Sequence, residues 1–373
     1  MQASKNQRAA VAVTGGAGLI GTRVVEALAG DFKVFILDAA DWPHGEPPGD
    51  SELLEIDLTE DRDVSRAMAE LHRRCDGRLA SFIHLAAHYD FSGADSPLYE
   101  ELSVRGTRRL LRKLREFDAE QFVFASTLLV MEPVEGEGRL TEASTTQAEW
   151  PYPESKLETE AVIDEERGTT PVVILRLAGV YDEAGNSPPL CQHIKRIYEK
   201  ALESYVFPGD KDSGQPYVHL EDVVACVEKT VARRRELGER EVFLIAEPEV
   251  MSHDELQETL GRLIHGREWP TIRVPKPVAK VGAWIQQRVL GREMFIKPWM
   301  VELADDHYPV AIDKARERLG WEPSKRLREV LRDMVGNLFT DVRGWYERNG
   351  LEPPPQEQAE HEEELESGAG GGT

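Results

Sequence analysis

The first hydrophobic pattern in the chain is a short apolar run that is followed at once by glycines. Residues 9–13 are apolar without alternation, which is typical of a parallel strand buried on both faces. Glycines follow at Gly15, Gly18 and Gly21, and without Cβ atoms they let the backbone turn sharply and approach a pyrophosphate. A helix from about Leu19 to Ala29 is expected to direct its N-terminal amides at the phosphates.

A second strand, predicted at residues 33–37, ends in Asp38. This acid lies about 20 residues beyond the glycines, where a carboxylate accepts hydrogen bonds from adenosine ribose hydroxyls. Between Ala39 and Gly49 there is no Lys or Arg to hold a 2′-phosphate, so we predict NAD rather than NADP as cofactor. An ordinary tight turn also explains glycines, but the strand, glycine, helix, strand and acid context favours a dinucleotide site.

The alternation of predicted strands and helices continues to about residue 181, which indicates an α/β fold with a doubly wound parallel sheet (Rossmann fold). The glycines and prolines of residues 182–214 interrupt this rhythm. Beyond them, residues 221–233 are predicted as a helix and residues 241–245 as a late strand of the main sheet. Ser252 and Glu255 have the spacing of a capping box that opens a helix to about Ile264.

Tyr152 and Lys156 are one helical turn apart, so their side chains share a helix face. A free tyrosine, with a pKa near 10, is a poor base at neutral pH, but a neighbouring Lys⁺ and a positively charged nicotinamide favour the phenolate. Tyr152 can then take a proton from a substrate hydroxyl as hydride leaves the carbon. Ser126 or Thr127, at the end of an apolar strand, is a candidate third donor. The alternative is that the pair lies on the surface near a helix start marked by Pro151 and Pro153.

Motifs in a fixed order over residues 9–335 resemble the extended short-chain dehydrogenases/reductases of the NAD-dependent epimerase/dehydratase type. The motifs are the Gly15–Gly21 turn, Asp38, Asp57-Leu58, His84-Leu85-Ala86-Ala87, Val104-x-Gly106-Thr107, Ser126-Thr127, Tyr152, Lys156, Leu175-Arg176, Val180-Tyr181, Tyr217–Val223 and Ala315–Pro323.

This resemblance implies a role for each matching residue. Thr127, Tyr152 and Lys156 would be catalytic, with Thr127 holding the reacting oxygen. Substrate would be contacted by Thr127 and also by His88 and Gly179. A lone His beside a Tyr in a loop is, however, more often an ordinary hydrogen-bonded residue than a ligand, and His84, inside a strand, is predicted to be a core histidine. The residues implied in NAD binding are Gly15, Gly18, Leu19, Ile20, Gly21, Asp38, Asp57, Leu58, Leu85, Ala86, Ala87, Ser126, Tyr152 and Lys156.

Three departures from the family pattern narrow the function. Leu128 and Leu129 follow Thr127, where 4,6-dehydratases have an Asp and a Glu; leucine cannot transfer protons, so dehydration is disfavoured. Gly179 and Gln215 stand where many nucleotide-sugar enzymes have an Asn and an Arg that hold the substrate diphosphate. Because Gln is not a bidentate phosphate partner as Arg is, a nucleotide-sugar substrate is also disfavoured.

The leading hypothesis is therefore an NAD-dependent oxidoreductase or epimerase that moves hydride at a secondary alcohol or ketone carbon of a small molecule. A nucleotide-sugar 4-epimerase is a second interpretation. A non-catalytic, NAD-sensing scaffold is a third, although such proteins usually lose the tyrosine or the lysine.

The resemblance and the break in rhythm predict the domains. Residues 1–181 with 216–247 form an NAD-binding Rossmann domain, and residues 182–215 with 248–350 form a smaller substrate-binding unit. The Glu- and Gly-rich residues 351–373 are predicted to be a disordered tail. Residues 278–303 carry an apolar helix-like pattern that either packs on the core of the small unit or lines an apolar substrate pocket.

Composition excludes several classes of partner. The net charge is −23, which disfavours nucleic acid and anionic membranes, and no apolar stretch is long enough to span a bilayer. Cys75, Cys191 and Cys226 are scattered and lack metal-type spacing, which predicts a reducing, cytoplasmic location without disulfides or metal. The family resemblance adds a possible homodimer.

Overall fold

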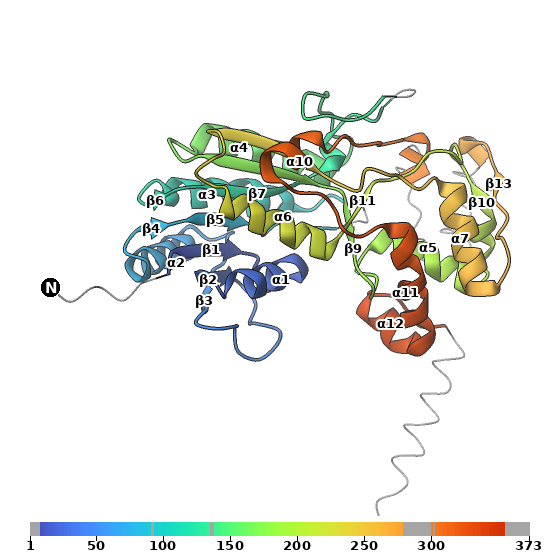
Figure 1. Ribbon diagram of the computed structural model, residues 1–373, viewed down its shortest axis with the longest axis horizontal. Helices are drawn as coiled ribbons and strands as arrows, with labels where there is room; N and C mark the ends of the chain where they lie inside the picture. Colours follow the sequence, from blue (N-terminus) through green and yellow to red (C-terminus); the bar gives the residue numbers. More distant parts are fainter. Residues whose placement is uncertain (1–7, 91–92, 135–137, 279–299, 302, 355–373) are drawn as a thin grey trace, which may run out of the picture. The chain divides into compact units, whose positions relative to one another are not determined.

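The computed structural model describes residues 8–90, 93–134, 138–278, 300–301 and 303–354 (Figure 1). The chain divides into two compact units. The first consists of Met1–Ala178, Leu220–Pro248 and Tyr308–Ser324, and the second of Gly179–His219, Glu249–His307 and Lys325–Thr373. The predicted tail beyond residue 354 and most of the apolar stretch 278–303 lie outside the described residues.

The first unit is built on a seven-stranded sheet in the order β12-β8-β7-β5-β1-β2-β3. Every neighbouring pair of strands is parallel, so the predicted doubly wound sheet is confirmed. Its strands are β1 (Ala10–Thr14), β2 (Lys33–Asp38), β3 (Glu52–Glu55), β5 (Ser81–His84), β7 (Phe122–Thr127), β8 (Val172–Leu177) and β12 (Arg240–Ile245). Short strands β4 (Arg78–Leu79) and β6 (Asp118–Ala119) pair separately.

Helices cover both faces of this sheet. On one face α1 (Leu19–Leu28) contacts α6 (Leu220–Ala232), which in turn contacts α10 (Asp313–Leu319). On the other face α3 (Arg105–Leu114) packs between α2 (Asp61–Arg74) and α4 (Pro151–Glu166) (Figure 1). Two short helical segments complete this unit. The π-helix η1 (Tyr99–Val104) leads directly into α3, and the 3₁₀ turn η2 (Leu128–Val130) follows β7.

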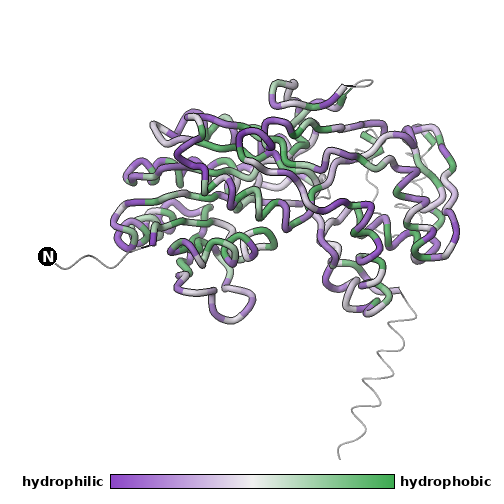
Figure 2. The backbone as a smooth tube through the Cα atoms, viewed as in Figure 1, coloured by the Kyte–Doolittle hydropathy of each residue, from purple (hydrophilic) through white to green (hydrophobic). Residues whose placement is uncertain are grey.

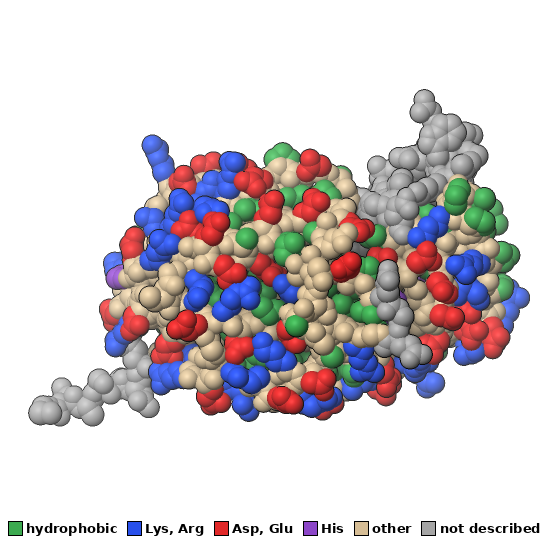
Figure 3. All heavy atoms as spheres, turned by 90° about the horizontal axis from the view of Figure 1, so that it is seen from above, with side chains coloured by type: hydrophobic (Ala, Val, Ile, Leu, Met, Phe, Trp, Pro, Cys, Tyr) green, Lys and Arg blue, Asp and Glu red, His purple; other side chains and the backbone are tan. Residues whose placement is uncertain are grey.

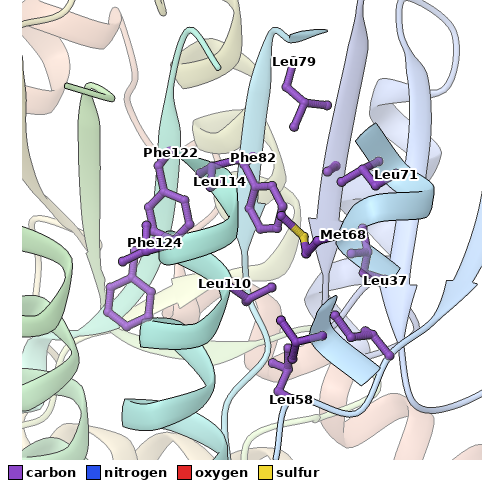
Figure 4. Packing of buried hydrophobic residues seen from close by; sticks show 14 of the residues in the cluster. Leu37, Leu58, Met68, Leu71, Leu79, Phe82, Leu110, Leu114, Phe122 and Phe124 are labelled. Carbon is purple, nitrogen blue, oxygen red and sulfur yellow. The ribbon is translucent and has the colours of Figure 1, made fainter. Parts of the chain in front are cut away.

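The core of the first unit lies between the sheet and α2 and α3. All six residues of β7 are buried, and Phe82 stacks on Phe122 with ring centroids 5.8 Å apart. Leu110 and Leu114 of α3 close the same cluster (Figure 4). Each large apolar side chain buried in this way contributes about 1.5–3 kcal/mol. The strands accordingly stand out as hydrophobic segments, and the connecting segments are more polar (Figure 2).

The second unit contains two short parallel pairs of strands, β9 (Gly179–Tyr181) with β11 (Tyr217–His219) and β10 (Val206–Phe207) with β13 (Ile272–Arg273). Its helical segments are α5 (Pro188–Tyr198), η3 (Leu202–Tyr205), α7 (His253–His265), η4 (Leu303–Asp305), α11 (Leu327–Thr340) and α12 (Val342–Arg348). The predicted capping box of α7 is confirmed, because the Ser252 hydroxyl accepts from the Glu255 amide at 3.2 Å and the Glu255 carboxylate accepts from the Ser252 amide at 3.1 Å.

Three segments fall in a different unit from the one their sequence indicated. Residues 179–181 and 216–219 belong to the second unit because β9 and β11 pair with each other rather than with the main sheet. Residues 308–324 belong to the first unit. There the Leu140 amide donates to the Pro309 carbonyl at 2.7 Å, and the Trp321 indole donates to the Asp222 carbonyl at 2.8 Å.

Surface charge gives no sign of a single-sign patch on the face shown in Figure 3, where acidic and basic side chains are interspersed. None of the described helices has the length and apolar character needed to cross a membrane.

Candidate active site

The glycine turn between β1 and α1 is tightly packed on one side and open on the other. Gly15 has φ +68°, and a Cβ there would lie 2.7 Å from the Ala86 amide nitrogen. A Cβ at Gly21 would collide with the Gly15 carbonyl. Gly18 caps α1 without any side-chain cap, and a Cβ there would meet only the Gly15 carbonyl. The first amides of α1 therefore face a space that an anionic group can enter.

The turn lies at the point where the strand order reverses. β1 and β5 are neighbours, but the chain leaves β1 toward β2 and leaves β5 toward β7, which is where open α/β sheets bind ligands. The half-buried Leu85, Ala86 and Ala87 follow β5, and the backbone of Leu85 and Ala86 lies directly beside Gly15. Leu19, in the first turn of α1, is 42% exposed. These predicted cofactor residues are thus gathered at one place.

The acid predicted to bind ribose lies against the same turn. Asp38 accepts from the Ala17 amide at 2.9 Å through Oδ2 and from the Ala40 amide at 3.0 Å through Oδ1, and each carboxylate oxygen can accept a further hydrogen bond. Asp57 accepts from the amide and the hydroxyl of Thr59. Leu58 is buried, close to Gly106 of α3. The open glycine turn and the carboxylate of Asp38 fit a dinucleotide cofactor.

His84 is a fully hydrogen-bonded core histidine, as predicted. The Thr107 hydroxyl donates to the Ser103 carbonyl at 2.6 Å, so its oxygen accepts from His84 Nε2 at 2.8 Å. His84 Nδ1 then accepts from the Thr14 hydroxyl at 2.6 Å. Burial, with the nearby Lys156 charge, lowers the pKa of His84 to about 3, so the ring is neutral and both nitrogens are satisfied.

The three predicted catalytic residues come together at the carboxyl end of β7. Thr127 is the last residue of β7, and Tyr152 and Lys156 are in the first two turns of α4. Lys156 Nζ donates to the Ala125 carbonyl at 2.8 Å and lies 5.9 Å from the centroid of the Tyr152 ring. Pro151 at the first position of α4 fixes the helix start and so places Tyr152 beside Thr127.

The electrostatics of this group differ from the sequence expectation. Burial lowers the pKa of Lys156 to about 8. Burial also raises the pKa of Tyr152, as does the neighbouring Tyr89, and only the Thr127 hydroxyl opposes the shift. The Lys156 ammonium, which donates to the Ala125 carbonyl, does not offset this rise in the pKa of Tyr152. Tyr152 therefore carries its proton at neutral pH in this structure.

Aromatic side chains surround the catalytic phenol. The ring of Tyr89 meets Tyr152 edge-on at 5.0 Å, and Trp150 lies 5.5 Å away on another side. Tyr89 is 50% exposed. From the sequence, Tyr89 beside His88 is a plausible substrate contact, whereas Trp150 was not assigned to the site, although its position two residues before Tyr152 was an available signal. The wall they form is aromatic rather than charged.

His88 is held by the π-helix η1, an irregular element that occurs often at functional sites. The His88 amide donates to the Ser103 hydroxyl at 3.1 Å, and its ring meets Tyr99 edge-on at 4.7 Å. The Tyr99 hydroxyl donates to the Asp90 carbonyl at 3.0 Å. The Nε2 atom of His88 is buried and has no hydrogen-bond partner in the described structure. This loop is thus fixed with one polar atom free for a ligand.

Ser126 faces the core instead of supplying the third donor. Its hydroxyl donates to Glu160 at 2.6 Å, and Glu160 pairs with Arg176 at 2.7 Å. All three side chains are buried. Thr127 is therefore the candidate that remains. Sequence reasoning missed Glu160, whose position four residues after Lys156 places it on the same face of α4.

Gly179 belongs to the second unit, where its amide donates to the Pro216 carbonyl at 3.1 Å. A Cβ at this position would lie 3.0 Å from the Tyr217 ring. An Asn there would have to displace that ring, which explains physically why this chain departs from the family pattern at residue 179. Over the described residues, no group of three or more His, Cys, Asp or Glu side chains is placed to hold a metal ion.

Comparison with known proteins agrees with this geometry. The profile of the NAD dependent epimerase/dehydratase family matches residues 11–246. The chain is 26% identical to human 3 beta-hydroxysteroid dehydrogenase type 7, over 85% of this chain and 92% of that protein. It is 25% identical to UDP-glucose 4-epimerase of Streptomyces lividans, over 86% and 93%.

Solved structures show the same fold. Thermus thermophilus UDP-glucose 4-epimerase in complex with NAD superposes with a TM-score of 0.65 at 23% identity, covering 88% of this chain and 99% of that one. MoeE5 in complex with UDP-glucose and NAD gives 0.66 at 22% identity, covering 89% and 99%. The chain belongs to the NAD-dependent epimerase/dehydratase family and is an NAD-dependent enzyme of the extended short-chain dehydrogenase/reductase type.

Proposed function

We propose that this enzyme moves hydride at a secondary alcohol or ketone carbon of a small-molecule substrate, with Thr127, Tyr152 and Lys156 as its catalytic residues. The observation that carries the proposal is the convergence of these three side chains at the end of β7, in the unit that also holds the open glycine turn. When bound, NAD would supply the ring carbon that accepts hydride from the substrate or returns it.

In this proposal Thr127 and Tyr152 both bind the substrate oxygen. In the direction of reduction, the Tyr152 phenol donates its proton to the carbonyl oxygen as the carbon receives hydride. In the direction of oxidation, the phenolate must form first and then takes the hydroxyl proton. Because burial raises the pKa of Tyr152, oxidation is expected to accelerate as the pH rises above neutral.

Lys156 keeps a positive charge near the reacting oxygen and binds the Ala125 carbonyl, which ties α4 to β7. Net oxidation results if the reduced cofactor leaves. Epimerisation results if hydride returns to the opposite face of the same carbon. The proton transfers at Tyr152 are the same in both outcomes.

The substrate side favours an apolar molecule. Leu128 is buried after Thr127, and the exposed Tyr89 stands against Tyr152. These surroundings suit a partly hydrophobic alcohol better than a polyhydroxylated sugar. The nucleotide-sugar 4-epimerase remains a second candidate because relatives of that name align over most of the chain. Gly179 and Gln215 weigh against it.

The test is the Tyr152→Phe variant, assayed against a panel that includes 3β-hydroxysteroids and UDP-glucose. Loss of the proton donor should lower kcat/KM about 10²- to 10⁴-fold, while the variant still binds NAD, as followed by fluorescence. Tyr89→Phe is the matched control because it keeps the edge-on ring. A Tyr152→Phe enzyme with full turnover would exclude this mechanism. NAD binding without turnover across the whole panel would favour the sensing scaffold.

Two further predictions accompany this proposal. We infer a cytoplasmic location from the composition, to which the three free thiols of Cys75, Cys191 and Cys226 lend support. A homodimer remains an inference from the family, and sedimentation of the purified chain would test it.

A further inference from the structure

Arg196 is a partly buried cation whose contacts differ from those of the fully buried Lys156 and Arg176. It lies near the end of α5 in the second unit, and its Nε is buried without a hydrogen-bond partner. Among the described residues no carboxylate lies within 4.0 Å of its guanidinium. Burial lowers the pKa of Arg196 to about 10, and the more distant charge of Glu203 only partly opposes this shift. A guanidinium in such surroundings is costly unless a negative group joins it.

The rings beside Arg196 cannot supply that negative group. His253 stacks between Phe207, at 3.6 Å, and His193, at 5.1 Å. Burial and the charge of Arg196 lower the pKa of His193 to about 4 and that of His253 to about 2. Both imidazoles are therefore neutral near pH 7. His193 lies three residues before Arg196 on α5, so the charge nearest to it along this helix face is not offset by an anionic ring.

A second cation is fixed close to the same rings. Lys211, whose charge also lowers the pKa of His253, pairs with Asp254 at 2.8 Å. The Asp254 amide donates to the Lys211 carbonyl at 3.1 Å, and the His253 amide donates to the Ser213 carbonyl at 2.8 Å. The loop is thereby anchored to the start of α7. Because Lys211 is neutralised by Asp254, Arg196 is the uncompensated charge of this cluster.

We propose that Arg196, with the stacked rings of His193, His253 and Phe207 beside it, binds an anionic oxygen group of a small molecule. A carboxylate and a phosphate share the required chemistry, since a guanidinium donates two parallel hydrogen bonds to either. The site is formed entirely by the second unit and does not depend on the hydride chemistry of the first. It also differs from positions 179 and 215, where this chain has Gly and Gln.

Calorimetric titration of the full chain tests this site, with NAD present at saturation so that pyrophosphate cannot enter the glycine turn. Inorganic pyrophosphate and succinate are the two probes, and the tighter binder tells phosphate from carboxylate. Arg196→Gln should weaken binding of that probe at least tenfold. Arg262→Gln, which removes an exposed arginine already paired with Glu258 and Glu268, should leave it unchanged. Failure of both probes to bind the native chain, or equal binding by Arg196→Gln, would overturn the proposal.

A stability measurement separates this role from a structural one. If Arg196 serves ligand binding rather than the fold, Arg196→Met should keep or raise the Tm of the ligand-free chain, because the substitution removes a partly buried charge that has no ion-pair partner in the described part of the chain. A large fall in Tm would mean that the guanidinium holds the fold together, against the proposal. NAD affinity, measured alongside, should be unaffected, so a failure of the cofactor site would be recognised separately.

Discussion

The two units differ in how they accommodate an arginine that is withdrawn from solvent, fully for Arg176 and partly for Arg196. In the first unit, Arg176 meets Glu160 through two hydrogen bonds of 2.7 and 3.1 Å, and Ser126 donates to the same carboxylate. In the second unit, Arg196 is partly buried, and its buried Nε has no hydrogen-bond partner among the described residues. The Arg176 guanidinium, which has a structural role, is paired with a carboxylate of its own unit. The Arg196 guanidinium, for which we propose a ligand-binding role, has no such partner in the ligand-free chain as the structure describes it.

Two histidines of the first unit repeat this contrast within four residues. His84 has a partner on each ring nitrogen. His88 is fixed through its backbone and its ring face, but its buried Nε2 has no partner in the described structure. Whether each ring nitrogen has a hydrogen-bond partner therefore distinguishes a core histidine from a candidate ligand-binding histidine more clearly than the burial of the ring does.

The largest effect is expected from breaking the compensated pair. Glu160→Gln keeps the shape of the side chain but leaves the buried charge of Arg176 without its counterion. The free energy of unfolding should fall by about 3–5 kcal/mol, as measured by urea denaturation. Glu165→Gln is the control on the same helix, since its ion pair with Arg108 is exposed and is worth less than about 1 kcal/mol. A loss at Glu160 no greater than at Glu165 would refute the structural role of the pair.

Much of the first unit could be predicted from the sequence because local signals and tertiary structure agree there. Apolar runs predicted the strands, and the glycine spacing predicted the turn. In the second unit, the capping box of Ser252 and Glu255 predicted the start of α7. The resemblance also brought Thr127, Tyr152 and Lys156 to one place.

What the sequence could not show depends on partners that are distant along the chain. Whether Ser126 or Thr127 faces the site depends on Glu160, 34 residues after Ser126. The direction of the Tyr152 pKa shift depends on desolvation and on Tyr89, which no spacing reveals. That Arg196 lacks a counterion is likewise a property of packing and not of pattern.

A smaller effect is expected from the buried charge of Lys156. Its pKa in the folded chain is about 8, against an ordinary value of 10.5. Between these pH values the unfolded chain binds more protons than the folded chain, so this group makes stability rise with pH. Relative to Lys156→Met, the native free energy of unfolding should increase by on the order of 3 kcal/mol from pH 8 to pH 10.5. Parallel pH curves for the two proteins, measured by urea denaturation, would show that the ammonium is not desolvated.

The smallest effect is expected from substitutions of His88. They test whether its unpartnered Nε2, unlike the paired nitrogens of His84, contributes to substrate binding. Gln can place its amide nitrogen where histidine has Nε2, whereas Phe keeps a ring against Tyr99 without a polar atom. With the best substrate of the panel, His88→Phe should raise KM about tenfold, which corresponds to a hydrogen bond of about 1.4 kcal/mol, and should change kcat little. His88→Gln should recover most of the affinity. If His88→Phe instead lowered the Tm and left KM unchanged, His88 would be a packing residue like His84, and the unpartnered nitrogen would have no part in binding.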